Sequence, residues 1–222
     1  WLIGGLVVMS LSLLFAVILT SGIRGKKFFR AIIYMPNIVS AVALATMWLQ
    51  YVYSPRYGLL KDLFTALHLD NLAKIQFLDN DHKFWALLFA YCFGMVGYHM
   101  LIWLSGIERI SPEYYEAATI DGANAVKVFT RIKLPMLKPY IWFCSLNSVI
   151  SAIGVFDVVF VLTKGGPNDA TMVINYYSYT KAFSDFQFGY AAAIGAVQAV
   201  VTTMLSIVVF VYGKRGGMTN NE

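Results

Sequence analysis

"EYYEAATIDGANAVKVFTRIKLPMLKP", residues 113–139, is a polar stretch between two long apolar ones, and it decides the fold class. Ser111-Pro112-Glu113 predicts the start of a helix, with a Ser cap, Pro at the first position and an acid at the positive end of the helix dipole. Asp121-Gly122 predicts its end. We expect a second short helix from Ala123 to about Lys133, ending ahead of Leu134-Pro135. The stretch is therefore a loop of two short helices joined at a glycine. By composition alone, an interfacial hairpin that anchors two membrane spans also fits it.

The composition is that of a membrane protein. Of the 222 residues, 59% are hydrophobic and 13% are charged, and the mean hydropathy is +0.63. Soluble domains average about 45–50% apolar and about 25% charged residues. The net charge of +5 is modest and does not indicate nucleic acid as a partner. Cys92 and Cys144 lie in apolar runs, which predicts free thiols, and the three His have no ligand spacing, so we expect no metal site.

Five apolar segments are long enough to cross a bilayer, which takes roughly 20 helical residues. They are Trp1–Thr20, Ala31–Tyr53, Phe84–Ser105, Tyr140–Thr163 and Gly189–Tyr212. Pro36 and Asn37 predict a kink in the second segment, and Gly94 and Gly97 predict close helix packing in the third. We therefore expect an all-α fold, a polytopic bundle of transmembrane helices that forms one domain over residues 1–222.

The positions of Lys and Arg predict the orientation. Segments 21–30, 107–139 and 213–222 hold four, five and two of them, eleven together, against six in segments 54–83 and 164–188. Because positive residues are enriched on the cytoplasmic side, we expect the loop 107–139 and the C-terminal tail inside and the other two segments outside. The first span does not look like a signal peptide, since its basic residues follow it. The chain opens inside apolar sequence, so we expect one or more further helices ahead of it.

The two segments expected outside differ in character. Apolar residues at helical spacing predict a short amphipathic helix on the outer surface, formed by Leu59, Leu60, Leu63, Phe64 and Leu67. Segment 164–188 opens with a Gly-Gly-Pro turn and is rich in aromatic residues. An interfacial belt is the commoner explanation for such rings, and a specific aromatic platform is the alternative. The rings concerned are Tyr176, Tyr177, Tyr179 and Phe183.

The spacing inside the opening stretch resembles the EAA loop of permease subunits of binding-protein-dependent ABC importers. Glu116-Ala117-Ala118 is followed after three residues by Gly122, after nine more by Ile132 and after one more by Leu134-Pro135. The form "EAATIDGA" with "IKLP" is similar to the carbohydrate-uptake branch, of the maltose and glycerol-phosphate type. Other stretches extend the resemblance from about residue 25 to residue 195: "RGKKFFRAIIYMPNIVSAVALATMW", "FDVVFVLTKGGPNDAT" and "AFSDFQFGYAAAIGA".

This resemblance implies a type I ABC importer permease that takes part in ATP-driven uptake of a sugar, oligosaccharide or polyol derivative. The loop would then be a coupling helix that docks on a separate ATPase subunit. Its small residues would let the helix approach the partner closely, Gly122 would allow the bend, and Pro135 would stop the second helix. Glu116 is expected to pair with loop or partner groups. The residues assigned to coupling are Glu116, Ala117, Ala118, Asp121, Gly122, Ile132, Leu134 and Pro135.

The resemblance also implies partners in the cell (inner) membrane of a bacterium or archaeon. The sequence has no G-x-x-x-x-G-K-[ST] phosphate loop, so we expect no cofactor on this chain and ATP use by two ATP-binding cassette subunits. A second permease, identical or more plausibly different, would complete the pathway. An extracytoplasmic solute-binding protein is expected to touch the turn formed by Gly165, Gly166, Pro167 and Thr171.

Polar residues inside the spans are candidates for the solute pathway, because such residues face the bundle interior rather than lipid. Ala191 and Gly195 share a helix face with two of them, but packing alone explains these small residues. Asp157 either faces the pathway or caps a helix end near the outer surface. The candidates are Asn147, Ser151, Asp157, Gln198 and Thr202.

Three other functions compete with this one. The nearest is an importer of a different solute, such as an amino acid or phosphate, against which the "IDGA" and "TKGGP" pieces weigh. An ion-coupled secondary carrier or channel would need intramembrane charge, which Asp157 alone offers. An integral membrane enzyme would need clustered His, acids or a nucleophile at the bilayer surface. The sequence shows no such cluster, so we expect neither catalytic residues nor enzymatic activity.

Overall fold

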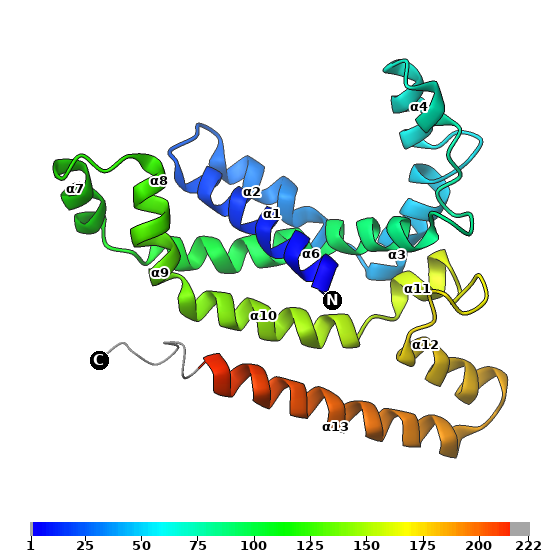
Figure 1. Cartoon of the computed structure of the whole chain (residues 1–222). Coiled ribbons are helices and arrows are strands. Elements are labelled where there is room, and N and C mark those ends of the chain that lie inside the picture. The colour runs from blue at the N-terminus through cyan, green and yellow to red at the C-terminus, as the bar shows by residue number, and fades with distance from the viewer. Residues whose placement is uncertain (1, 214–222) are drawn as a thin grey trace. The chain divides into compact units, whose positions relative to one another are not determined.

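The structure, a computed structural model, describes residues 2–213 (Figure 1). Trp1 and residues 214–222 of the tail that we expected in the cytoplasm lie outside this range. Within it the chain forms helices and no strand. The elements are α1 (Leu2–Thr20), α2 (Lys26–Tyr34), η1 (Met35–Asn37), α3 (Ala41–Met47), η2 (Trp48–Val52), α4 (Leu59–Ala66), α5 (Asp70–Ala73), α6 (Lys83–Glu108), α7 (Pro112–Ile120), α8 (Ala125–Val128), η3 (Phe129–Lys133), α9 (Leu134–Met136), α10 (Lys138–Ile153), α11 (Asp157–Leu162), α12 (Ile174–Tyr179), η4 (Thr180–Ser184) and α13 (Phe188–Gly213).

The predicted spans are present, with one difference of geometry. Four helical stretches within residues 2–213 are long and apolar enough to cross a membrane: Leu2–Thr20, Lys83–Glu108, Lys138–Leu162 and Phe188–Gly213. The second predicted span is instead a pair of helical pieces, Lys26–Asn37 and Ala41–Val52, bent by 95°. Counting the pair as one span gives five. The kink predicted at Pro36–Asn37 is confirmed, and the Asn37 side-chain amide donates a hydrogen bond to the Gly94 carbonyl.

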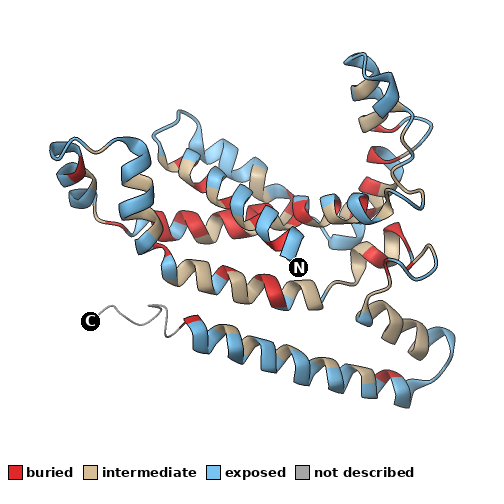
Figure 2. Cartoon of the chain, in the orientation of Figure 1, coloured by how far each residue is buried: buried red, intermediate tan, exposed pale blue. Residues whose placement is uncertain are grey.

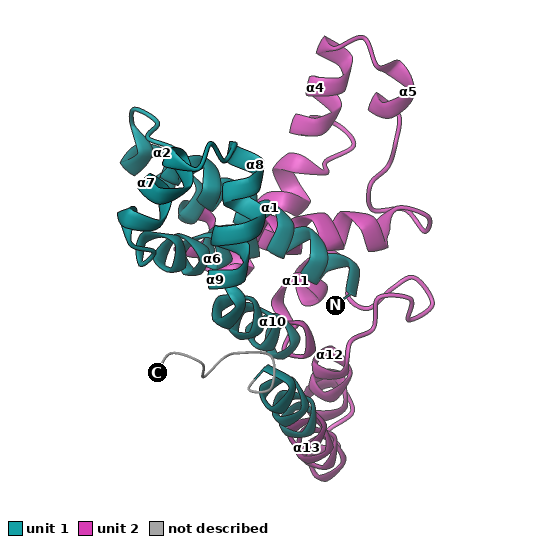
Figure 3. Cartoon of the chain, turned by 60° about the vertical axis from the view of Figure 1, so that its left-hand side comes forward, with its two compact units in different colours: residues 1–35, 95–151, 202–222 teal, residues 36–94, 152–201 magenta. Residues whose placement is uncertain are grey.

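The contacts divide the chain into two compact units, both within the single domain predicted for residues 1–222 (Figure 3). The described part of unit 1 comprises residues 2–35, 95–151 and 202–213. Unit 2 comprises residues 36–94 and 152–201. Helices α6, α10 and α13 each contribute residues to both units.

The core of unit 1 forms where α1, α6 and α10 meet. Trp103 is 1% exposed, and its indole N–H donates to the Ser12 hydroxyl at 3.0 Å. That hydroxyl donates in turn to the Met9 carbonyl at 3.0 Å. A buried donor left unpaired costs roughly 1–3 kcal/mol, so this pair fixes the register of α1 against α6. The rest of the buried cluster is apolar: Ala16, Leu19, Met100, Leu104, Ile107, Leu137 and Cys144.

Close packing of α6 on α2 depends on Gly97, as the sequence predicted. A Cβ atom at this position would run into the Ile33 carbonyl oxygen and lie 2.9 Å from the Tyr34 Cα. Gly94 is less restrictive, since its nearest neighbour, a Leu44 methyl carbon, would lie at an ordinary 3.5 Å. Gly97 therefore admits no side chain without movement of the backbone of α2.

Unit 2 has its own core, built around the π-helical turn η2. Trp48, Val52 and Tyr53 pack with residues of α6 and α11, and the Tyr53 hydroxyl donates to the Ala86 carbonyl at 2.8 Å. Helix α4 occupies the place of the predicted amphipathic helix, and its Leu60 packs against this core. Two of its leucines remain exposed, Leu59 at 63% and Leu63 at 51%.

Helix α13 is exposed along most of its length (Figure 2). Ala191 near its start is buried, at 7% exposure, and its carbonyl accepts a hydrogen bond from Ser178 at 3.2 Å. An added Cβ at Gly195 would meet no atom within 4 Å. The packing role expected of the two small residues is therefore present at Ala191, whereas nothing within residues 2–213 requires a small residue at Gly195.

Candidate functional site

The predicted coupling loop begins with α7, and a glycine ends that helix. Gly122 has a φ of +68°, in the left-handed region that glycine adopts without cost. Its N–H donates to the Thr119 carbonyl at 3.1 Å, and the Ala123 N–H donates to the Ala118 carbonyl at 2.9 Å. This pair of bonds is the Schellman arrangement, which satisfies carbonyls at a helix end. The helix stop predicted at Asp121-Gly122 is confirmed. The helix start is confirmed as well, with Ser111 at the N-cap position and Pro112 first in the helix, but the Ser111 side chain makes no capping hydrogen bond.

The second half of the loop differs from the prediction. Asn124 caps α8, its side-chain oxygen accepting from the Lys127 N–H at 2.9 Å. The helix does not end ahead of Leu134-Pro135 but continues through the π-turn η3 and α9 to Met136. Proline normally collides with the carbonyl one α-turn back and lacks an N–H. Here the Leu134 N–H binds the Phe129 carbonyl five residues earlier, and this wider turn accommodates the ring that follows it.

The two alanines of α7, Ala117 and Ala118, differ in exposure. Ala118 is buried, at 7% exposure, whereas Ala117 is exposed, so of the two alanines a partner can approach only Ala117 closely. Glu116, Asp121 and Gly122 are exposed. Sequence reasoning missed the large apolar residues that the loop leaves uncovered. They are Tyr114 at 53%, Ile120 at 86% and Val126 at 68% exposure.

A cation–π contact joins the two halves of the loop. The Lys133 ammonium lies 5.4 Å from the centroid of the Tyr115 ring. Burial lowers the pKa of Lys133 and raises the pKa of Tyr115 from their ordinary values, because both charged forms lose hydration. The Tyr115 hydroxyl is buried and has no hydrogen-bond partner within residues 2–213. The ring and the ammonium therefore hold α7 against η3.

Just after α9, the loop is anchored in the core of unit 1. Leu137 is fully buried and belongs to the cluster around Trp103. Gly106 of α6 makes room for it, because a Cβ there would lie 2.7 Å from the Leu137 side chain. Ile132 and Leu134, which the resemblance assigned to coupling, are half-buried, and Pro135 is exposed. Movement of the loop would thus be passed directly to packed helices.

Two of the predicted pathway residues lie together in unit 1. The Asn147 side-chain amide donates to the Tyr98 hydroxyl at 3.3 Å, and the Ser151 hydroxyl donates to the Asn147 side-chain oxygen at 3.4 Å. All three side chains are half-buried. Sequence reasoning missed Tyr98, which is 49 residues from Asn147 and lies on α6. The three form a polar line between α6 and α10 that could hydrogen-bond a hydroxylated solute.

Two further candidates, Gln198 and Asp157, lie in or near a helix break in unit 2. The helix is interrupted between Ile153 and Asp157, which frees backbone carbonyls. Gln198 donates to the Ile153 carbonyl at 3.3 Å. Asn175 donates to the same carbonyl at 3.3 Å and to that of Val155 at 3.4 Å. Asp157 is the first residue of α11, where the positive end of the helix dipole stabilises an acidic side chain.

Gln198 and Asp157 therefore have structural roles at the break: Gln198 binds a freed carbonyl, and Asp157 begins the next helix. Thr202, the last pathway candidate, is half-buried on α13. Sequence reasoning missed Asn175, because its partners lie 20 and 22 residues away across an unpredicted break.

The turn expected to touch a binding protein is internally bonded. The Thr171 side chain is buried, and its hydroxyl oxygen lies 2.8 Å from both the Thr163 hydroxyl and the Gly166 carbonyl oxygen. Gly165 is buried as well, with a φ of +79°. The exposed tip of the turn consists of Asn168, Asp169 and Ala170. Thr171 therefore shapes the turn, the predicted contacts Gly166 and Pro167 are half-buried, and the tip is its most accessible part.

The aromatic residues that follow this turn pack on one another in unit 2. Tyr179 lies 5.3 Å from Phe156 and 5.4 Å from Phe160, measured between ring centroids. Tyr176 lies 6.1 Å from Phe160.

Among residues 2–213, no group of three or more His, Cys, Asp or Glu side chains could hold a metal ion.

Comparison with known proteins agrees with this arrangement. The family described as "binding-protein-dependent transport system inner membrane component" matches residues 9–215. The permease of the diacetylchitobiose uptake system of Streptomyces coelicolor is 32% identical over 203 residues, which are 90% of this chain and 57% of that protein. The permease of the trehalose/maltose transport system of Thermococcus litoralis is 32% identical over 210 residues, 92% of this chain and 68% of that protein.

A solved structure shares the fold. The crystal structure of a bacterial ABC transporter involved in the import of the acidic polysaccharide alginate aligns with a TM-score of 0.77 at 22% identity. The match covers 96% of this chain and 77% of that one. The chain spans 66%, 57% and 64% of the lengths of three curated relatives that it matches, which is less than two thirds in each case.

Proposed function

Because the chain belongs to the family of binding-protein-dependent transport system inner membrane components, we propose that it is a membrane-spanning permease subunit of an ATP-driven importer. It forms part of the translocation pathway for a sugar, oligosaccharide or polyol derivative. The named solutes of two relatives, diacetylchitobiose and trehalose/maltose, support this class. The observation that carries the proposal is the loop of residues 112–136, whose helices, glycine stop and anchored end fit a coupling element.

The loop docks on a partner ATPase and moves with it as a rigid element. Its docking surface consists of Ala117 and the exposed apolar residues Tyr114, Ile120 and Val126. Large apolar residues exposed on one loop, here on α7 and α8, favour a protein partner. When the ATPase subunits move, the cation–π contact and the buried Leu137 carry the displacement into the core of unit 1. Rigid-body motion of packed helices is a common way to switch between two access states.

The proposed orientation puts this loop and the C-terminal tail in the cytoplasm. Segments 54–83 and 164–188 then lie outside, where the tip at Asn168–Ala170 meets a solute-binding protein. The eleven Lys and Arg of segments 21–30, 107–139 and 213–222 support this assignment. The complete importer contains a second permease, in a heterodimer, and two ATP-binding cassette subunits that use the ATP.

Within the pathway, the polar line of Tyr98, Asn147 and Ser151 offers hydroxyl and amide groups to the solute. Such groups match the alternating donors and acceptors of a carbohydrate. Gln198 and Asp157 act at the edge of the pathway by holding the break in span four, and Thr202 adds a hydroxyl on α13.

Co-purification from native membranes in mild detergent tests the proposal. Gly122→Pro forces a negative φ where the chain needs +68°, so it should distort the loop and release the ATPase. Gly195→Ala is the matched control, since the added Cβ meets open space. We expect the ATPase to accompany the intact chain and the control but not Gly122→Pro, with sugar uptake lost in that variant alone. An intact chain that purifies without any ATPase, or a Gly122→Pro variant that imports normally, contradicts the proposal.

A further inference from the structure

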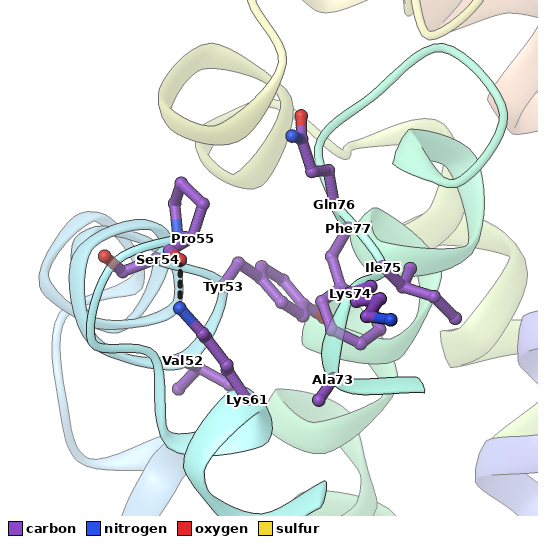
Figure 4. Close-up of a pocket in the computed structure, with 10 residues that line it drawn as sticks. All are labelled: Val52, Tyr53, Ser54, Pro55, Lys61, Ala73, Lys74, Ile75, Gln76 and Phe77. Carbon is purple, nitrogen blue, oxygen red and sulfur yellow. Dashed lines mark hydrogen bonds between the residues drawn. The ribbon is translucent and has the colours of Figure 1, made fainter. Parts of the chain in front are cut away.

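Segment 54–83 carries a small cleft that no role assigned above uses (Figure 4). Its volume is about 230 Å³. One wall is the turn of residues 52–55 and the other is segment 73–77, with Lys61 of α4 beside the turn. The ring of Tyr53 lies between the two walls (Figure 4). All of these residues belong to unit 2.

The cleft is held in shape by contacts below it. Tyr53 is 4% exposed, bonds to the Ala86 carbonyl through its hydroxyl and lies 5.5 Å from Phe77, between ring centroids. The turn is closed tightly at Gly58, where a Cβ would run into the Ser54 carbonyl oxygen and lie 2.8 Å from that of Val52. A pre-formed cleft of this kind loses little entropy when a partner enters it.

The charge of the lining is one-sided. Two of the ten lining residues, Lys61 and Lys74, are cationic, and none carries a carboxylate. Lys61 donates to the carbonyls of Pro55 at 2.9 Å and Arg56 at 3.4 Å, which fixes its ammonium and leaves one of three N–H donors unused. Lys74 is exposed, and its side chain makes no hydrogen bond or ion pair within residues 2–213.

We infer that this cleft receives a carboxylate side chain, an Asp or Glu, from the extracytoplasmic solute-binding protein. This inference rests on the proposed function and its orientation, which put segment 54–83 on the outer face. The cleft supplies positive charge and hydrogen-bond donors without a competing acid, which is the complement that a carboxylate requires.

The size of the cleft favours a side chain over a transported solute. Pockets that enclose whole small ligands measure about 300–1,000 Å³, and this one is smaller at about 230 Å³. A free monocarboxylate would also lose its translational freedom for a few exposed contacts. A side chain on a protein that already docks at the Asn168–Ala170 tip avoids most of that loss, because its second contact is intramolecular.

The test uses the complete importer in lipid nanodiscs, with the solute-loaded binding protein that stimulates its ATP hydrolysis. Lys74→Glu reverses one lining charge, Lys74→Gln removes it, and Lys83→Glu is the control on the same segment outside the cleft. We expect the Kd of the binding protein to rise about tenfold for Lys74→Glu and about threefold for Lys74→Gln. The salt dependence of the Kd should fall in both variants, and ATP hydrolysis at saturating binding protein should stay unchanged.

The inference gains support if the Lys83→Glu control keeps the Kd of the intact importer. It gains further if an Asp→Lys or Glu→Lys change in the binding protein restores tight binding to Lys74→Glu. An unchanged Kd for Lys74→Glu overturns it, and so does an equal rise for Lys83→Glu. A shifted KM for the solute with an unchanged Kd also overturns it, since the cleft would then receive the solute. If no binding protein stimulates the intact importer, the proposed function itself fails.

Discussion

The ammonium of Lys133 lies 5.4 Å from the centre of the Tyr115 ring, so two helices that meet at a glycine are also held together at a second point. A hinge with one connection can swing, whereas a second contact fixes the angle. This relationship makes the loop able to transmit a displacement rather than absorb it. Because both groups are partly buried, solvent weakens the attraction less than at a fully exposed site.

Removing either partner should loosen the loop. We expect Tyr115→Leu or Lys133→Met to cost about 0.5–1 kcal/mol of stability and to raise the number of ATP molecules hydrolysed per solute imported. Tyr115→Phe keeps the ring and removes only a hydroxyl that is buried without a partner, so it should behave like the intact chain. The measurement is the ratio of ATP hydrolysis to uptake in proteoliposomes. A ratio that stays constant in Tyr115→Leu would show that the contact plays no part in coupling.

The stability lost on substitution of Gly122 should depend on how readily the new residue adopts a positive φ. Gly122→Ala should lose about 1–2 kcal/mol, because alanine resists the left-handed conformation that the Schellman turn requires. Asn tolerates this conformation better than Ala, so Gly122→Asn should lose less. Hydrogen exchange of the amides in residues 112–124 measures the effect. Equal protection in the Ala and Asn variants would mean that the turn does not depend on this φ.

Gly97 and Gly195 predict opposite outcomes for the same substitution. Gly97→Ala pushes a methyl group into the backbone of α2 and should cost about 1–3 kcal/mol. Gly195→Ala places it in open space and should be neutral or slightly stabilising, because alanine favours a helix by about 1 kcal/mol. Thermal unfolding in detergent, followed by tryptophan fluorescence, compares them. Similar Tm values would contradict the close contact between α6 and α2.

The stability of the turn before α6 should depend on pH. The Asp79 carboxylate accepts from the His82 ring at 2.8 Å and from the His82 N–H at 3.0 Å, which lowers the pKa of Asp79 below its ordinary 3.8. A lowered folded-state pKa adds stability above the ordinary value, and this stability is lost as the pH falls through the folded pKa. Asp79→Asn should therefore lower the Tm at pH 7, and the difference should shrink as the pH drops below 4. A difference that is the same at pH 3 and pH 7 would contradict the carboxylate's role.

Sequence reasoning located what local rules determine. The five apolar segments gave the spans because a bilayer sets a minimum helix length, and Gly122 gave the end of α7 because its conformational need is local. The motif spacing identified the family for a different reason, since it matches a pattern of residues and not a physical rule.

What escaped prediction depends on contacts between distant residues. Nothing near Gln198 in sequence reveals that its amide bonds the Ile153 carbonyl 45 residues earlier. The same holds for Tyr98 and Asn147. Pro135 was misjudged because the rule for proline assumes an α-helical turn before it, and the π-turn that precedes it leaves no mark in the residue pattern.

The π-turn at Phe129–Lys133 also ties the length of the loop to its proline. A π-turn holds about one residue more than an α-turn, so deleting one residue there would restore regular α-helix. The residues after the deletion would keep nearly the same direction around the helix axis, and Leu137 would stay in the core of unit 1. Pro135 would then follow a regular α-turn, where its ring collides with the carbonyl four residues earlier. Among homologous sequences, a deletion of one residue in this segment should therefore occur together with loss of the proline.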